Sequence, residues 1–275
     1  MRNTSMLEVR PKSAPLGAVV EGLDLHAELD RDTVAALRDA LLQHEVLFFP
    51  EANLTPTEQI RLGRIFGNLQ CHAVLDALAD APEVVVFDTA RKASTAEWWH
   101  SDVTCAPEPP MGAMLQMVVA PPTGGATHWA SVTAAYDALD DDTKTRIEDL
   151  HALHRSWWEP RQEAVHPVVR VHPENGRRAI FVNGIFTKRI VELDERESAD
   201  LLAFLFAHAT RPEFTVRHDW HRGDIAFWDN RSTQHRVDND FGDARRCGHR
   251  VTIDGDAPRG IHAHAVQSND RSTTR

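Results

Sequence analysis

Short apolar runs that end at proline or glycine recur along this chain of 275 residues, and they limit its possible folds more than any other feature. The run 46–49 reads Val-Leu-Phe-Phe and is followed by Pro50. Apolar runs of about four to eight residues between such turn signals are typical of buried strands. Further runs occupy 84–87, 111–120, 127–130, 179–182, 224–228 and 250–253. The chain is therefore expected to be mainly β.

A few segments show helical periodicity instead. Apolar residues recur at helical spacing in 32–43 and 195–208, and 140–150 opens with three aspartates, which suit the positive end of a helix dipole. Another helix is expected after Thr55, because Pro56 and Glu58 complete a capping-box pattern. Many short strands with a few covering helices predict a double-stranded β-helix, or jelly roll, that closes around a pocket.

The length and composition fit one globular domain. With 42% hydrophobic and 26% charged residues, the chain is close to the soluble average, and we expect a single domain over 1–260 and a polar, flexible tail over 261–275. The formal net charge of -11 argues against nucleic acid or an anionic membrane as a partner. An anionic ligand would need a local cluster of arginines.

Cysteine usage bears on the cellular compartment. Cys71, Cys105 and Cys247 are odd in number and widely separated, so they form neither a zinc pattern nor a disulfide framework. This usage is typical of a reducing cytoplasm. The first residues lack the apolar run of a signal peptide, and no stretch approaches the roughly eighteen consecutive apolar residues of a membrane-spanning helix. We expect a soluble, cytoplasmic protein.

The segment Trp99-His100-Ser101-Asp102 is the main candidate for chemistry. On a strand, residues two apart project from the same face, so His100 and Asp102 can reach one metal ion. His235 is the candidate third ligand. Two histidines and one carboxylate that leave open coordination positions are the arrangement of non-haem Fe(II) oxygenases. The pair alone is weak support in a chain with 16 histidines and 41 acidic residues.

Several motifs together are more specific, and in their order and spacing the chain resembles the taurine dioxygenase (TauD/TfdA-like) family of Fe(II)- and 2-oxoglutarate-dependent dioxygenases. The resemblance covers nearly the whole chain. The motifs lie at 99–104, 109–110, 124–127, 166–170, 186–190, 228–235 and 245–250.

The resemblance implies a role for each matched residue. His100, Asp102 and His235 would bind Fe(II), and the open metal positions would take 2-oxoglutarate and O2. Arg246, assisted by the Thr127 hydroxyl, would bind the distal carboxylate of 2-oxoglutarate. This role agrees with the fork that a guanidinium offers to a carboxylate. The structural alternative for Thr127 is that of a simple strand former.

The resemblance also implies how the substrate is bound. Arg250 would face the substrate anion, and His72 and Phe186 match the family's substrate contacts, although His72 also fits a structural histidine in a loop.

Arg245 is expected to point away from Arg246, toward solvent or an acidic partner such as Asp243. Family members are often dimers or tetramers, so we expect a homo-oligomer.

Two positions depart from the taurine-specific pattern. Ala96 replaces an asparagine, and Leu75 aligns with a tyrosine that is associated with the substrate amine. The expected substrate is therefore a small anionic molecule with an apolar tail, an alkyl sulfonate or alkyl sulfate ester. Hydroxylation beside sulfur or the ester oxygen would release sulfite or sulfate and an aldehyde. The segment 154–165 is short for the family, where a longer lid covers the substrate. Either Trp157 and Trp158 partly replace this lid, or the site is more open to a larger substrate.

Other interpretations remain open at this point. A phosphate- or carboxylate-bearing substrate fits the same Arg250. A zinc hydrolase would use the same three ligands with a metal-bound water, but it has no use for Arg246. A metal-binding jelly-roll sensor without turnover is the non-enzyme alternative, although Arg246 and all three ligands are present.

Overall fold

The computed structural model describes residues 7–12, 14–72, 75–91, 96–158 and 160–262. Its main feature is a large sheet in the order β1-β2-β3-β14-β6-β16-β5-β4, in which β2 and β3 pair in parallel and the other pairs between the described strands are antiparallel. The strands of this sheet are β1 (Glu8–Pro11), β2 (Ala18–Glu21), β3 (Val46–Phe49), β4 (Ala77–Leu78), β5 (Ala81–Asp88), β6 (Gly112–Val119), β14 (Ile225–Asp229) and β16 (Cys247–Ile253).

A smaller sheet faces the large one. It has the order β13-β7-β15, from β7 (Thr127–Ser131), β13 (Thr215–His218) and β15 (Thr233–Val237). Apolar side chains of both sheets fill the space between them: Phe48 of β3 meets Trp129 of β7 at 5.5 Å between ring centroids, and Trp129 meets Trp228 of β14 at 5.9 Å. Two facing sheets around such a core form the jelly roll that the sequence predicts.

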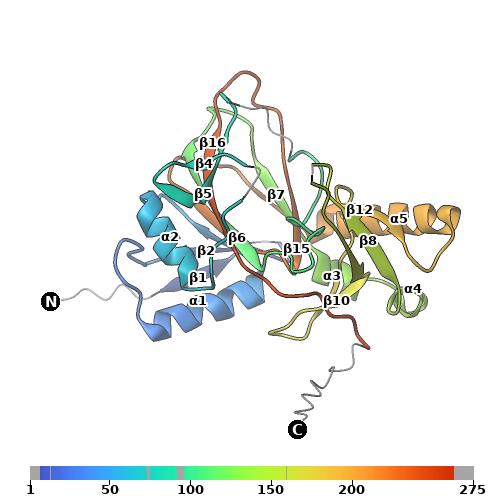
Figure 1. Ribbon diagram of the computed structural model, residues 1–275. Helices are drawn as coiled ribbons and strands as arrows, with labels where there is room; N and C mark the ends of the chain where they lie inside the picture. Colours follow the sequence, from blue (N-terminus) through green and yellow to red (C-terminus); the bar gives the residue numbers. More distant parts are fainter. Residues whose placement is uncertain (1–6, 13, 73–74, 92–95, 159, 263–275) are drawn as a thin grey trace, which may run out of the picture.

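Two helices cover the outer face of the large sheet (Figure 1). They are α1 (Arg31–His44) and α2 (Pro56–Arg64), and the predicted capping box of α2 is present, with Thr55 and Glu58 bonded reciprocally. Leu37, Leu41 and Leu62 are buried against this face. Full burial of each leucine contributes about 1.5–3 kcal/mol.

The remaining elements form a separate apolar cluster at the other end of the molecule (Figure 1). Ile261, expected to begin the tail, packs against this cluster, and only the first two residues of that segment are described. The elements are α3 (Val132–Asp137), α4 (Asp141–Ile147), α5 (Glu195–Ala209), the 3-10 turn η1 (Pro212–Phe214), and the strands β8 (His151–Arg155), β9 (Glu163–Pro167), β10 (Val169–Val171), β11 (Arg178–Ile180) and β12 (Thr187–Ile190).

Most predicted elements are confirmed, with three corrections. The predicted strand at His100–Asp102 is wrong, because His100 forms only an isolated bridge and Asp102 lies in a turn. His235, which the sequence pattern predicts in a loop between the strands 224–228 and 250–253, lies on β15. The helix expected over 140–150 ends at Ile147, since the chain turns into β8, which the sequence did not indicate. Within the described ranges, no helix is long and apolar enough to cross a membrane.

Candidate active site

The backbone brings His100 and His235 together although they are far apart in sequence. The amide of His100 donates to the carbonyl of His235 at 3.0 Å, and the amide of His235 donates back at 2.7 Å. This reciprocal pair attaches the segment before Asp102 to β15 and places the two imidazoles 4.2 Å apart. The expected strand at His100–Asp102 does not form, and backbone pairing with β15 brings the two histidines together instead.

Asp102 is fixed by a residue that the sequence analysis missed. The side-chain carbonyl of Asn230 accepts from the Asp102 amide at 2.7 Å, and its amino group donates to the Asp102 carbonyl at 3.0 Å. The next residue, Val103, has a φ of 49°, so the chain turns sharply there. A signal was present, because Asn230 lies five residues before His235 in the motif 228–235.

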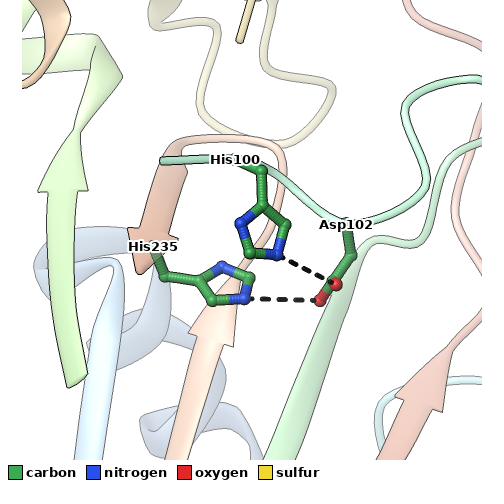
Figure 2. Close-up of side chains that lie close together, drawn as sticks. All are labelled: His100, Asp102 and His235. Carbon is green, nitrogen blue, oxygen red and sulfur yellow. Dashed lines mark ion pairs between the residues drawn. The ribbon is translucent and has the colours of Figure 1, made fainter. Parts of the chain in front are cut away.

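The three side chains converge on one point (Figure 2). Asp102 Oδ1 lies 3.9 Å from His100 Nε2, and Asp102 Oδ2 lies 4.0 Å from His235 Nε2. All three groups are buried, with one ligand atom from each within 4.8 Å of the others. Asp102 Oδ2 is buried without a hydrogen-bond partner among the described residues. This donor set fits a metal ion, because an ion would satisfy the orphaned oxygen.

The protonation states also suit a metal. Burial lowers the pKa of His100 and lowers that of His235 to about 3, so both imidazoles are neutral near pH 7. His100 Nδ1 lies 2.8 Å from the Trp98 carbonyl, which places the proton there and the lone pair on Nε2. Burial opposes ionisation of Asp102, but Arg250 and the histidines outweigh it and lower its pKa to about 2.

Arg246 lies directly before β16 and is buried. Its Nε donates to the Gly125 carbonyl at 3.2 Å and its Nη2 to the Thr127 hydroxyl at 3.3 Å. Gly125 has a φ of 69°, a conformation that favours glycine. The Thr127 hydroxyl also accepts from the indole of Trp220 at 2.9 Å, a contact that the sequence did not reveal. The structure therefore brings the two predicted 2-oxoglutarate residues together.

Arg250 of β16 contacts the candidate metal site directly. Its Nη1 donates to Asp102 Oδ1 at 3.0 Å, and its Cζ lies 4.7 Å from the centre of the Phe87 ring. Its Nε is buried and has no hydrogen-bond partner in the described part of the chain. Arg250 thus orients one oxygen of Asp102 and keeps a further donor.

The other predicted residues occupy the surroundings as follows. His72 is half-buried; burial lowers its pKa, the charge of Arg250 lowers it further, and the charge of Asp102 raises it. Phe186 is buried beneath Trp157. Arg245 points away from Arg246 as predicted, but its acidic partner is Asp88, at 2.8 and 3.0 Å, and not Asp243.

Comparison with known proteins identifies the family. The model of the "Taurine catabolism dioxygenase TauD, TfdA family" matches residues 8–252. The chain belongs to this family. As predicted, it is therefore an Fe(II)- and 2-oxoglutarate-dependent dioxygenase with a jelly-roll fold. Membership implies the use of 2-oxoglutarate and O2, and Fe(II) is implied by the family together with the His100–Asp102–His235 group.

Individual relatives are similar over most of their length. The "Alkylsulfatase" of Acinetobacter baylyi is 37% identical, covering 94% of this chain and 88% of that protein. The "Alpha-ketoglutarate-dependent sulfate ester dioxygenase" of Pseudomonas putida is 35% identical, covering 93% and 92%. The crystal structure of a taurine dioxygenase from Burkholderia xenovorans is 40% identical with a TM-score of 0.88, covering 94% and 92%. α-Ketoglutarate and 2-oxoglutarate are the same compound.

Proposed function

We propose that this enzyme oxidises an alkyl sulfate ester, or a related alkyl sulfonate, and releases sulfate, or sulfite, with an aldehyde. The observation that carries the proposal is a pair of buried arginines, one of which contacts the His100–Asp102–His235 group. Arg250 donates to Asp102, and Arg246, four residues before it, donates to the Thr127 hydroxyl. The names of the two curated relatives, both referring to sulfate esters, support the same reading.

Arg246 is suited to bind 2-oxoglutarate. It is only 5% exposed, and none of the described carboxylates forms an ion pair with it. Burial lowers its pKa to about 10, so it stays a cation near neutral pH. A buried cation without a counter-ion is costly, and a carboxylate bound by the guanidinium fork removes that cost. We assign this carboxylate to the distal end of 2-oxoglutarate, with Thr127 as a second contact.

Arg250 and His72 are suited to bind the substrate anion. Arg250 donates from Nη1 to Asp102, and its Nε has no hydrogen-bond partner among the described residues. An anionic head group on Arg250 would stand beside the metal-binding carboxylate, which places the adjoining carbon near the metal. His72, whose pKa the charge of Arg250 lowers, would add a contact to the same head group, and Phe186 would exclude water from one side.

The residues divide the work of the reaction. His100, Asp102 and His235 would hold Fe(II), which with 2-oxoglutarate supplies O2 activation. One oxygen atom goes to 2-oxoglutarate, which becomes succinate and CO2. The other converts R–CH2–OSO3⁻ to R–CH(OH)–OSO3⁻. The C–O bond to sulfate then breaks, the hydroxyl proton leaves with the sulfate, and R–CHO remains. Arg250 would hold the substrate anion and Arg246 would hold 2-oxoglutarate in fixed positions throughout the reaction.

Taurine is a second candidate, because the similar solved structure is named a taurine dioxygenase. Taurine carries an ammonium group that needs a polar partner. The two positions that the family resemblance associates with that end are Ala96 and Leu75, which offer only apolar side chains. We therefore expect sulfate esters to be preferred over taurine.

The first test measures succinate, sulfate and aldehyde after aerobic incubation of the purified protein with Fe(II), 2-oxoglutarate and ascorbate. The substrate panel contains alkyl sulfates, alkyl sulfonates, taurine, phenoxy carboxylates and alkyl phosphates. We expect alkyl sulfates to stimulate succinate release, with sulfate and aldehyde formed in equal amounts. His100→Ala should end succinate release with every substrate. Stimulation by a carboxylate or phosphate alone would overturn the sulfur assignment and leave the enzyme class intact.

Two further expectations concern the cellular setting. All three cysteines are free, and Cys105 and Cys247 are buried, which agrees with a reducing cytoplasm. We also propose that the enzyme is a homo-oligomer, a dimer or tetramer, which light scattering after size-exclusion chromatography would determine.

A further inference from the structure

Three aromatic side chains, Trp157, Trp158 and Phe186, form one continuous aromatic cluster. Trp157 stacks on Phe186 with 5.4 Å between ring centroids, and Trp158 meets Phe186 edge-on at 5.9 Å. The two indoles are 4.8 Å apart. Trp157 is 65% exposed, whereas Phe186 is only 2% exposed. The cluster therefore leads from solvent into the interior.

The inner end of the cluster is attached to the turn that carries Asp102. The amide of Phe186 donates to the side-chain carbonyl of Asn183 at 2.9 Å. The amino group of the same Asn183 donates to the hydroxyl of Thr104 at 3.0 Å. Thr104 lies two residues after Asp102, so one buried side chain fixes Phe186 relative to the candidate metal site.

The other side of the cluster reaches the proposed anion site. Trp158 lies 6.4 Å from His72 between ring centroids. The charge of Arg250 acts on His72, and Arg250 is bonded to Asp102. The cation Arg250 and the aromatic cluster are therefore both joined to the Asp102 turn, the cluster through Asn183 and Thr104.

This arrangement matches an amphiphilic molecule with an anionic head and an apolar tail. We propose that Trp157, Trp158 and Phe186 bind the tail of the substrate and make the enzyme selective for sulfate esters with a long alkyl chain over short ones. The inference rests on the proposed function, since the head group must be on Arg250 for the tail to meet the cluster. It extends that function by assigning chain-length selectivity to two tryptophans of the loop between β8 and β9.

Burial of each methylene group adds a constant increment of transfer free energy, equivalent to about fourfold in binding. For the wild type, kcat/KM should therefore rise by up to about fourfold per methylene through ethyl, butyl, hexyl and octyl sulfate. KM should fall accordingly. The Kd of the unreacted sulfate should fall as well, measured by calorimetry with anaerobic enzyme, Fe(II) and 2-oxoglutarate. A structural role of the tryptophans would not produce a dependence on chain length.

Variants locate this selectivity. Trp158→Ala should reduce the ratio of kcat/KM for octyl over ethyl sulfate by tenfold or more. Trp158→Phe should restore most of the ratio, because an aromatic face remains. Trp157→Ala, at a largely exposed position that tolerates truncation, should show a smaller reduction. Phe204→Ala, a matched exposed aromatic on α5, should match the wild type.

The outcomes separate this inference from the proposed function. If ethyl and octyl sulfate were turned over equally well by the wild type, the aromatic cluster would not bind the tail, although the function would stand. Equal losses for short and long sulfates in Trp158→Ala would assign the residue a structural role and overturn the inference. Failure of every sulfate and sulfonate to release succinate would overturn both.

Discussion

Asn230 is the side chain on which the position of Asp102 depends most directly. It bonds the amide and the carbonyl of Asp102 and also donates to the Pro110 carbonyl at 3.1 Å. It is 1% exposed, so water cannot replace these bonds without rearrangement. Asn230 therefore acts as a positioning residue for the proposed metal ligand, comparable with the outer partners that orient ligands in metal sites.

Replacing Asn230 with alanine should weaken metal binding and stability together. Buried groups of Asp102 and Pro110 would lose their partner, at a cost of about 2–4 kcal/mol in the free energy of unfolding. The affinity of the apo-protein for Mn²⁺ should fall roughly 10–100-fold. Urea unfolding and calorimetric titration with Mn²⁺ measure the two effects.

Asn239→Ala provides the control, since Asn239 is exposed and its side chain donates to Glu97 at the surface. It should leave both quantities near their wild-type values. If Asn230→Ala were destabilised but bound Mn²⁺ with wild-type affinity, Asn230 would support the fold and not the ligand.

At the scale of elements, the hydrophobic pattern predicts the helices and strands that pack in the apolar core, and it misses strands whose buried side chains are polar. The apolar run of β3 and the spaced leucines of α1 are recognisable because they pack against apolar side chains. The strand β15 reads Thr-Gln-His-Arg-Val and buries four of its five side chains, three of them polar. These include His235 of the candidate site and Gln234, which donates to the Val182 carbonyl. The strand β8 likewise buries His154. Hydrophobic periodicity cannot reveal such strands, and the bond between Arg250 and Asp102 depends on pairing across the whole chain.

The turn between β14 and β15 shows how elements position the site. Arg231 in this turn contacts both oxygens of Asp229, at 2.9 and 2.6 Å, and reaches Glu174 at 2.8 Å. His172 lies 3.0 Å from the same Asp229 carboxylate. Burial opposes ionisation of Asp229, but Arg231 outweighs it and holds the pKa of this carboxyl well below its usual range. The buried ion pair of Arg231 and Asp229 therefore stabilises the hairpin that carries Asn230 and His235.

Arg231→Met should therefore lower the free energy of unfolding by about 3–5 kcal/mol, because it leaves the buried Asp229 carboxylate with an uncompensated charge. Equilibrium unfolding in urea measures this loss. The exposed pair of Arg196 and Asp200 on α5, 4.0 Å apart, offers the comparison, and Arg196→Ala should change stability by less than about 1 kcal/mol. Similar small losses in both variants would show that the turn does not depend on its ion pair.

At the scale of the whole molecule, Glu45 joins the two halves of the fold. It follows α1, is 3% exposed, and accepts hydrogen bonds from Thr133 of α3 and from Arg177 before β11. Its backbone carbonyl accepts from the Asp229 amide at 2.9 Å. Burial raises its pKa from 4.5 to about 7, against the opposing effect of Thr133 and Arg177. The folded protein therefore binds this proton more tightly than the unfolded chain does.

The sign of the resulting pH dependence follows from linkage. Since the folded pKa is the higher one, Glu45 costs nothing below about pH 4.5, becomes destabilising as the pH rises toward 7, and reaches a constant cost of about 3 kcal/mol above that. Glu45→Gln keeps the oxygen that accepts from Thr133 and Arg177 but cannot ionise. The stability of Glu45→Gln minus that of the wild type should therefore grow between pH 4.5 and 7 and then level off. Urea unfolding at several pH values gives this difference directly, with Glu28→Gln at an exposed position as the control for the substitution itself. A flat difference for Glu45→Gln would mean that Glu45 ionises in the fold as readily as in the unfolded chain.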